Sequence, residues 1–483
     1  MTVVANGCHP KTTAAGDLNA VVKKSTVLTP DAEEYEPSLK RWASQAEKPA
    51  AVVLKARSAE DVAAAVVVAQ KHSLEVAVLG GGHGSNGASS TNGGLLIDLT
   101  PMSKVTVDVD KKTATAEGGA RWEDVDVPLG ENGLATVGGR VSNTGIGGLT
   151  LGGGYGWLSG KYGLTDDNLL SAKMVLADGR IVTTSETENP DLFWAVRGAG
   201  QCFGVAVEFT YQAHELSYPV WAGQLVLKEE HLEEVFGFVN HFFKVVKNGN
   251  AAMTAGLTSP PVSAIITSLF YDGPKEEAEK FYAPLLALGP VENSTRQMPY
   301  QEVNTVITHR VPWGVRRLVR GASFIAPVNI PFVKSLVQDL KELSERIPGP
   351  NPMPPSTVMY ELTDNTLLSQ VPHGTMSFAN RGPQQNVMIF PQWANPKHDG
   401  RVRDWTQKIA AKFDQELARM EKEEGAVLDR DAVHQYSNYD GVLARAEDIF
   451  GQKNFERLTR IKAKYDPKDV FSTSYEIPPA FDN

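Results

Sequence analysis

The sequence has few cysteines, no long run of apolar residues and no basic cluster. Its two cysteines, Cys8 and Cys202, are too few for a disulfide framework or a cysteine-rich metal site. The longest apolar run, Val62 to Ala69, is far shorter than the roughly 18 residues that can cross a bilayer. With a formal charge of -10 and no long Lys/Arg run, the chain is expected to bind neither nucleic acid nor an anionic membrane.

The first residues, Met1 to Cys8, contain no basic stretch followed by an apolar core. We therefore expect no secretory signal and an intracellular, cytoplasmic protein. The ten histidines show no metal-ligand spacing, so we expect no metal site. A length of 483 residues exceeds one ordinary core and predicts at least two domains. An enzyme is the leading class for a large acidic protein of this composition.

Glycine is concentrated in two segments. Residues 80–94 contain seven glycines and residues 138–163 contain eleven, and both segments are flanked by strand-like sequence. Such clusters let backbone N–H groups approach a ligand closely, most often a phosphate. The alternative is a set of tight turns in a β-rich region.

The first cluster formally contains the dinucleotide motif GxGxxG, at Gly82, Gly84 and Gly87. A Rossmann site needs a helix directly after this loop to hold the pyrophosphate. Here the strand-like segment 95–99 follows within a few residues and leaves no room for a helix. The pattern therefore does not predict a Rossmann site.

The pattern of predicted helices and strands changes near residue 213. Before it, residues 51–79 read as strand, helix and strand, and Asp178-Gly179 predicts a hairpin turn within 173–184. After it, amphipathic segments alternate with strand-like runs, and residues 454–465 form a final helical pattern. We predict a domain at 1–212 with its core at about 45–212, a second domain at 213–435, and a C-terminal segment at 436–483 that returns to the first.

Several short motifs follow one another in a specific order. They are Pro49-Ala-Ala-Val-Val, Gly81-Gly82-His83, Gly93-Gly94-Leu-Leu-Ile-Asp98, Gly145-Ile-Gly147-Gly148, Gly152-Gly153-Gly154-Tyr155-Gly156, Asp191-Leu-Phe-Trp194, Phe203-Gly204-Val205, Tyr436-Ser-Asn438-Tyr439 and Phe450 to Leu458. Together they resemble one known family, the vanillyl alcohol oxidase and p-cresol methylhydroxylase superfamily in its berberine-bridge-enzyme-like branch. The resemblance implies an α+β fold with a two-lobed PCMH-type FAD-binding domain, and a second α+β substrate domain made of an antiparallel sheet backed by helices.

The resemblance implies FAD as cofactor, with its pyrophosphate against the loop Gly80–Gly84 and its ring against the segment Gly145–Gly156. The residues it implies as cofactor-binding are Gly80, Gly81, Gly82, His83, Gly84, Ser85, Asn86, Val141, Thr144, Gly145, Gly147, Gly148, Gly152, Gly154, Tyr155, Gly156 and Val205.

His83 corresponds to the family's histidine that bonds covalently to the flavin 8α-methyl carbon. The alternative is a turn histidine that only hydrogen-bonds backbone. Many members have a second link through a cysteine, but Val141 stands at that position. We therefore expect FAD to be linked through His83 only, which makes oligosaccharide substrates less expected.

Three further positions carry expectations from the resemblance. Thr144 lies where the family controls dioxygen access, with ordinary packing as the alternative. Tyr439 corresponds to a tyrosine that helps to remove the substrate proton, and a phenol with a reference pKa of about 10 needs an activating partner for that role. The alternative for Tyr439 is a core residue on a strand, and Tyr436 and Asn438 are weaker candidates as its neighbours. The ending Val470–Pro478 departs from the family pattern, so flavin contacts from this tail are not expected.

We expect an FAD-dependent oxidase that takes a hydride from an alcohol or amine carbon of a small organic substrate and passes the electrons to dioxygen, giving hydrogen peroxide. The alternatives are a flavoprotein that catalyses oxidative or non-redox cyclisation, a dehydrogenase with poor dioxygen reactivity, and a non-enzymatic flavin-binding protein.

Overall fold

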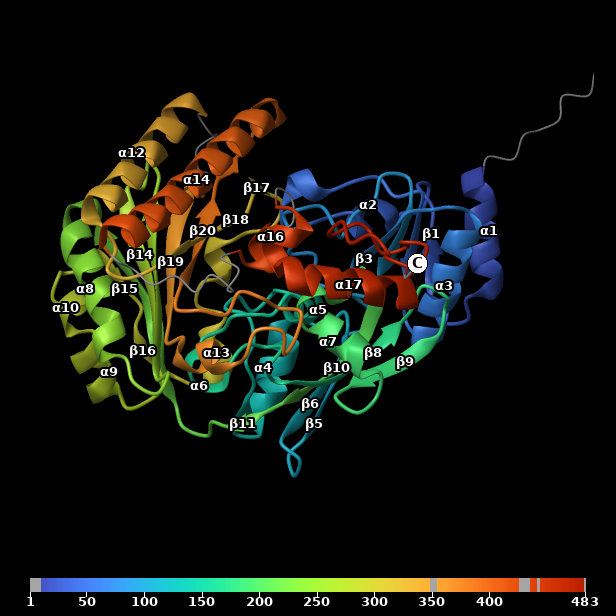
Figure 1. The fold of residues 1–483 in the computed structure, drawn as a ribbon, viewed down its shortest axis with the longest axis horizontal. Helices are drawn as coiled ribbons and strands as arrows, with labels where there is room; N and C mark the ends of the chain where they lie inside the picture. Colours follow the sequence, from blue (N-terminus) through green and yellow to red (C-terminus); the bar gives the residue numbers. More distant parts are fainter. Residues whose placement is uncertain (1–9, 348–353, 425–434, 441–443, 482–483) are drawn as a thin grey trace, which may run out of the picture.

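A computed structural model describes residues 10–347, 354–424, 435–440 and 444–481 (Figure 1). The segment Met1–Cys8, on which the expectation about secretion rests, lies outside these residues. Two smaller sheets form one half of the molecule and an eight-stranded antiparallel sheet forms the other. This arrangement confirms the predicted α+β fold. The predicted boundaries at residues 212 and 435 remain predictions, although every strand of the large sheet lies between them.

The first small sheet has the strand order β1-β2-β4-β3 and the second has the order β5-β6-β10-β8-β9. The bounds are β1 Thr26–Leu28, β2 Val52–Lys55, β3 Val76–Leu79, β4 Leu95–Asp98, β5 Val105–Asp108, β6 Thr113–Glu117, β8 Leu169–Val175, β9 Ile181–Ser185 and β10 Val205–Gln212, with a separate pair of β7 Leu134–Ala135 and β11 His214–Glu215. Strands β2, β4 and β3 are parallel, and β8 and β9 form the predicted hairpin.

The large sheet has the order β15-β12-β14-β13-β19-β20-β18, with β16 also paired to β12. Its strands are β12 Val220–Lys228, β13 Ala251–Thr258, β14 Ala264–Tyr271, β15 Glu292–Asn293, β16 Arg296–Met298, β18 Arg320–Phe324, β19 Thr357–Thr363 and β20 Gln385–Phe390, and a separate pair is β17 Arg316–Arg317 with β21 Gln392–Trp393.

The helices are mostly short on the N-terminal side and longer beside the large sheet. They are α1 Pro10–Val21, α2 Tyr35–Ser38, α3 Ala59–Lys71, α4 Trp122–Glu131, α5 Ile146–Leu151, α6 Ser159–Tyr162, α7 Pro190–Ala199, α8 Leu232–Val245, α9 Lys275–Phe281, α10 Ala283–Leu286, α11 Tyr300–Val303, α12 Ile330–Arg346, α13 Thr366–Gln370, α14 Asp399–Glu424, α15 Ser437–Asp440, α16 Ala446–Phe450 and α17 Gln452–Tyr465.

The loop between β3 and β4 contains no helix, which confirms that the GxGxxG pattern is not a Rossmann site. Ser58 caps α3, because its hydroxyl accepts the N–H of Asp61. Gly82 has a φ of +67°, a conformation that a side chain disfavours, so glycine is needed there for the loop to turn after β3.

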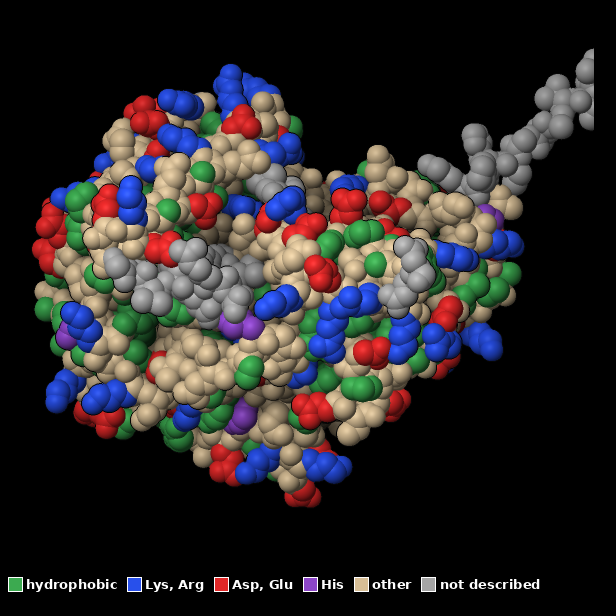
Figure 2. All heavy atoms as spheres, viewed as in Figure 1, with side chains coloured by type: hydrophobic (Ala, Val, Ile, Leu, Met, Phe, Trp, Pro, Cys, Tyr) green, Lys and Arg blue, Asp and Glu red, His purple; other side chains and the backbone are tan. Residues whose placement is uncertain are grey.

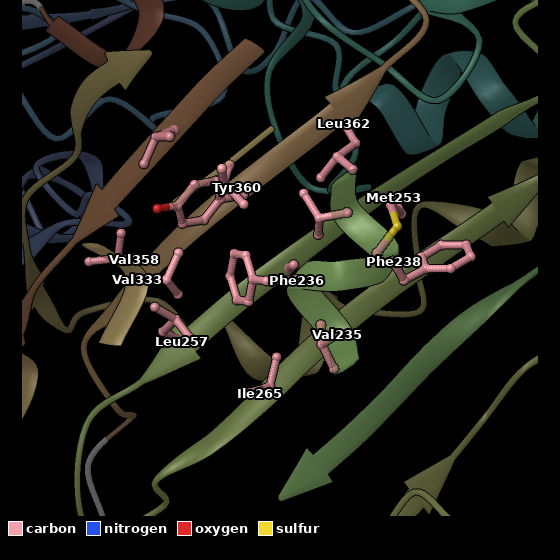
Figure 3. Close-up of a cluster of buried hydrophobic side chains, with 14 of the residues drawn as sticks. Val235, Phe236, Phe238, Met253, Leu257, Ile265, Val333, Val358, Tyr360 and Leu362 are labelled. Atoms are coloured by element: carbon pink, nitrogen blue, oxygen red, sulfur yellow. The ribbon is translucent and has the colours of Figure 1, made fainter. Parts of the chain in front are cut away.

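Side-chain alternation along the large sheet separates a core face from a cavity face. On β19, Val358, Tyr360 and Leu362 pack into the main core, where α8 and α12 cover the sheet (Figure 3). The residues between them, among them Met359 and Glu361, face the other way. Helices α8, α9, α10, α12 and α14 lie on the outer face (Figure 1), so the inner face of the sheet is left to form the wall of a site.

Part of the C-terminal segment lies against the N-terminal half. Helix α17 packs against α7, and residues of both share one core with β10 (Figure 1). The ammonium of Lys462, which is fully buried, donates to Asp466 at 2.7 Å and to the carbonyl oxygens of Cys202 and Phe471. These bonds fix the end of the chain against the first half.

A buried carboxyl connects the two halves. Asp126 on α4 accepts a hydrogen bond of 2.7 Å from Asn304, which follows α11 in the large-sheet half. Burial raises the pKa of Asp126 to about 7. The Oδ1 atom of Asn304 is buried without a hydrogen-bond partner among the described residues.

The Asp126→Asn variant is expected to melt about 2–5 °C above the wild type at pH 8. The raised pKa means that the wild type is most stable below the unfolded-state value of about 4, and loses stability as the pH rises to about 7. The variant amide carries no charge at any pH and can donate to the orphaned Asn304 oxygen. Thermal melting is measured from pH 4 to pH 8, with exposed Asp110→Asn as control. The difference in melting temperature between Asp126→Asn and the wild type should disappear at pH 4. A difference independent of pH would contradict this account.

Candidate functional site

A cavity of about 700 Å³ lies between the glycine-rich loops and the inner face of the large sheet. It also receives residues of the tail and of the Tyr436–Tyr439 segment. The predicted site residues on its walls are Gly80, Gly81, Gly82, His83, Gly84, Ser85, Asn86, Val141, Thr144, Gly145, Gly147, Gly148, Tyr155, Tyr436, Asn438 and Tyr439. The structure therefore brings most of the predicted site together, although its parts are far apart in the sequence.

The first glycine loop offers unused backbone donors. No N–H group from Gly81 to Gly87 donates a hydrogen bond to the described part of the chain. Gly81 and Gly145 touch through their backbones, since a Cβ atom on Gly81 would lie 2.3 Å from the Gly145 Cα atom. Consecutive free amides suit a diphosphate, which is the group that FAD would place there.

The second glycine segment has two different functions. Gly147 and Gly148 line the cavity, and a Cβ atom on Gly148 would meet nothing within 4 Å, so this wall leaves room for a flat ring. Gly152, Gly154 and Gly156 do not line the cavity. A Cβ atom on any of them would approach a neighbouring oxygen to 2.4 Å or less, so these three glycines permit close packing behind the wall.

Cofactor binding by Val205 stays a prediction, and the Val205 side chain does not line the cavity. Val205 is fully buried in a core cluster with Val175 and Val207. Because side chains alternate along β10, its neighbours Gly204 and Ala206 line the cavity instead.

His83 is held by three neighbours. Its ring stacks on Trp42, with centroids 4.4 Å apart and planes 18° apart, and it meets the edge of Trp313. Its Nε2 atom lies 2.8 Å from Oδ1 of Asn143, a carbonyl oxygen that can only accept, so Nε2 carries the hydrogen. Its Nδ1 atom has no hydrogen-bond partner among the described residues. Burial lowers the pKa of His83 to about 4, so the imidazole is neutral and nucleophilic at pH 7.

Tyr439 lies on the short helix α15, and not on a strand as the alternative interpretation had it. Its hydroxyl donates to Oε1 of Glu361 at 3.0 Å. Arg140 contacts the same carboxylate oxygen at 3.1 Å and lies over the ring of Trp157. Burial and the Glu361 charge raise the pKa of Tyr439 well above its usual range. The partner of Tyr439 is thus a carboxylate, and not the positive charge that would favour a phenolate.

Glu361 is the only carboxylate on the cavity wall within the described ranges. Its exposed fraction is 5%. Its Oε2 atom is buried without a hydrogen-bond partner in the described structure. A buried carboxylate oxygen without a donor is ready to accept a proton from a bound molecule.

Tyr436 and Asn438 support the glycine segment. The Asn438 amide donates to the Tyr436 hydroxyl at 2.8 Å and to the Leu149 carbonyl at 3.0 Å. The Tyr436 ring lies edge-on to Tyr155 and Tyr439, at centroid distances of 5.0 and 4.7 Å. These contacts place three tyrosines around the end of the cavity that contains Glu361.

The tail also reaches the cavity. Thr473, Ser474 and Tyr475 line it, although flavin contacts from the tail were not expected. Their backbone runs along the wall after Phe471, which the buried Lys462 anchors. Cys202 is fully buried and does not line the cavity, and burial raises its thiol pKa to about 11.

Sequence reasoning missed Glu361, Arg140, Trp42 and Asn143. A signal existed for Glu361, because it continues the alternation of Thr357 and Met359 on one face of a strand whose other face is apolar. Trp42 and Asn143 gave no comparable signal, since their importance depends on contacts with His83 across 41 and 60 positions of the chain.

Comparison with known proteins decides the family. The model of the FAD binding domain matches residues 49–185, and the berberine and berberine-like model matches residues 435–478. The FAD-linked oxidoreductase pgmH of Aspergillus terreus is 35% identical over 476 residues, which cover 96% of this chain and 95% of that protein. The chain belongs to the berberine-bridge-enzyme-like family. It is an FAD-dependent oxidoreductase, and the resemblance found in the sequence is confirmed.

Solved structures of the family have the same fold. The 6-hydroxy-D-nicotine oxidase of Arthrobacter nicotinovorans is 25% identical with a TM-score of 0.79, and the match covers 95% of this chain and 99% of that one. The xylooligosaccharide oxidase of Myceliophthora thermophila is 23% identical with a TM-score of 0.79, covering 97% of this chain and 100% of that one. Both likenesses extend over the two halves.

The visible outer surface has no large patch of one type of side chain. On the face in Figure 2, acidic and basic side chains are interspersed and hydrophobic ones appear as separate spots. No helix in the described ranges is long and apolar enough to span a membrane. In the same residues, no group of three or more His, Cys, Asp or Glu side chains could hold a metal. The cavity is the candidate active site because most of the predicted site residues line it.

Proposed function

We propose that the protein is an oxidase that removes a hydride from a carbon bearing a hydroxyl or amino group of a small organic substrate, and that dioxygen takes the electrons as hydrogen peroxide. The observation that carries this proposal is Glu361, which lines the same cavity as the glycine loops. One of its oxygens is held by Tyr439 and Arg140, and the other is buried without a hydrogen-bond partner in the described structure. FAD, when bound, accepts the hydride.

Glu361 is the proposed base. Its free Oε2 atom takes the proton from the substrate O–H or N–H while the adjacent C–H bond gives up its hydride, so the substrate loses two electrons and two hydrogens. Tyr439, which keeps its own proton, positions the carboxylate through its hydrogen bond. Arg140 stabilises the carboxylate charge. The role predicted for Tyr439 thus becomes a positioning one in this proposal.

The proposed cofactor linkage is a single covalent bond to His83. The hydrogen on Nε2 is held by Asn143, which leaves the Nδ1 lone pair to form the bond. Val141 lies on the cavity wall, and its side chain cannot form a second bond.

Acid precipitation followed by peptide mass spectrometry tests the linkage, and anaerobic mixing tests the chemistry. We expect flavin on the peptide that contains His83 and none on the peptide that contains Val141. Bleaching of the yellow colour by an alcohol or amine, with peroxide on re-aeration, supports the oxidase. Product formed without flavin reduction would indicate non-redox cyclisation, and reduced flavin that persists in air would indicate a dehydrogenase.

Replacing Thr144 by Leu is expected to slow flavin re-oxidation by dioxygen at least about tenfold, which corresponds to about 1.4 kcal/mol of barrier. Thr144 lies on the cavity wall, and the longer side chain would fill space beside Gly145. Thr144→Val, which keeps the size, should change the rate less than about twofold. Stopped-flow mixing of reduced protein with dioxygen measures this step. Equal slowing of the anaerobic reductive step would show that the position does not control dioxygen.

A further inference from the structure

The inner face of the large sheet carries a row of polar side chains that crosses four strands. Gln224 on β12 pairs with Ser268 on β14, Ser268 pairs with Thr254 on β13, and Thr254 pairs with Glu361 on β19. All four line the cavity, and their exposed fractions are 4–6%. Three strand spacings of about 4.8 Å make this row about 14 Å long, ending at the proposed base.

The polar row has hydrogen atoms without acceptors. The Ser268 hydroxyl accepts from the Gln224 amide at 3.0 Å, and the Thr254 hydroxyl accepts from the Ser268 N–H at 3.2 Å. Neither hydroxyl has an acceptor for its own hydrogen among the described residues. The row therefore presents two hydroxyl donors to the cavity, followed by the free acceptor of Glu361.

A parallel row on the same face is apolar. Ile266 pairs with Gly256, Gly256 pairs with Met359, and Met359 pairs with Met388. All four line the cavity, about 7 Å from the polar row because two residues separate them along each strand. Gly256 has no side chain and leaves a narrow gap between Ile266 and Met359, where an added Cβ atom would already lie 3.1 Å from Cγ2 of Thr357.

We propose that the substrate is a flat, fused-ring aromatic alcohol that bears oxygen along one edge and hydrocarbon along the other. This inference rests on the proposed function and adds the substrate class. A sugar bears hydroxyl groups around its whole rim and would leave several of them unpaired against Ile266, Met359 and Met388. A fused-ring substrate with one oxygenated edge satisfies both rows, with its ring over Gly256.

Three probes separate the classes: 7-(hydroxymethyl)-2-naphthol, whose two oxygens lie on the same long edge, 2-naphthalenemethanol and cellobiose. In each naphthyl probe the CH2OH group would become an aldehyde, with its electrons passing to dioxygen as peroxide. We expect kcat/KM for the naphthol to exceed that for 2-naphthalenemethanol about five- to tenfold, since one hydrogen bond contributes about 1 kcal/mol. Cellobiose should be slower than either.

The double variant Thr254→Val with Ser268→Ala should reduce the naphthol preference to about one, because both donors are lost. Thr267→Val is the matched control. Thr267 lies next to Ser268 on β14 and is fully buried, but it does not line the cavity. It should keep the preference. If the double variant fails to fold, Gly256→Val gives a second measurement. It fills the gap and should lower kcat/KM for both naphthyl probes, relative to benzyl alcohol, at least about tenfold.

Peroxide formed faster from cellobiose than from the naphthyl probes would overturn the substrate class and leave the oxidase proposal standing. A preference unchanged in the double variant would also overturn it. Binding of none of the probes, measured as a shift of the flavin spectrum, would reject the fused-ring class.

Discussion

The Glu361→Gln variant is expected to lose about 10³-fold in the rate of anaerobic flavin reduction while it retains its flavin. The amide has the shape of the carboxylate but cannot accept the substrate proton. Because Glu361 is the only carboxylate on the described cavity wall, no neighbouring group replaces it. The rate of bleaching in stopped flow, with bound flavin measured by absorbance, gives the effect directly.

Stability must be separated from catalysis in this experiment. Removing Glu361 leaves Arg140 buried without its charge partner, and breaking a buried pair costs about 3–5 kcal/mol. Adding Arg140→Leu to Glu361→Gln removes both charges, so thermal stability should partly recover while the reduction rate stays low. Recovery of the rate together with stability would contradict a role for Glu361 as base.

A second glutamate offers a matched control. Glu277 also accepts from a tyrosine hydroxyl, that of Tyr271, at 3.4 Å, but it does not line the cavity. Glu277→Gln should change the reduction rate less than about twofold, since surface changes away from the site are usually small. The flavin reduction rate of Tyr439→Phe should lie between those of Glu361→Gln and Glu277→Gln, because the base Glu361 remains but loses the hydrogen bond that positions it.

The sequence predicted the elements that depend on local pattern. The hairpin at 169–185 and the amphipathic helices, among them α17, follow from turn residues and apolar spacing close together in the chain. The glycine loops were predicted for the same reason. The family resemblance then ordered these pieces into one site.

The missing parts of the site depend on distant contacts. Tyr439 and Glu361 meet although 78 positions separate them, and Arg140 joins them from a third segment. No local pattern specifies such a meeting, so the partner of Tyr439 could not be predicted. The orientation of the Val205 side chain is a different kind of question, because it depends on which face of β10 turns inward, and only sheet packing decides that.

His83→Ala is expected to reduce the acid-stable flavin from nearly all of the cofactor to none, and to lower the rate of flavin reduction by about tenfold or more, or about 1.4 kcal/mol. The free N–H groups of the loop from Gly81 to Gly87 should still hold FAD without a bond, so the protein is expected to remain yellow until it is precipitated. Flavin in the acid pellet, measured by absorbance and confirmed on the peptide, checks this result.

His214 provides the control that tests why His83 reacts. Its ring stacks on Tyr162 at 3.7 Å, and its Nε2 atom lies 2.7 Å from Oδ1 of Asn168, so its surroundings resemble those of His83. His214 does not line the cavity. His214→Ala should therefore leave the acid-stable flavin unchanged. A neutral, stacked and oriented imidazole occurs at both positions, and access to the cavity is what distinguishes His83 from His214. Loss of the linked flavin in both variants would show that the bond depends on general stability and not on His83 itself.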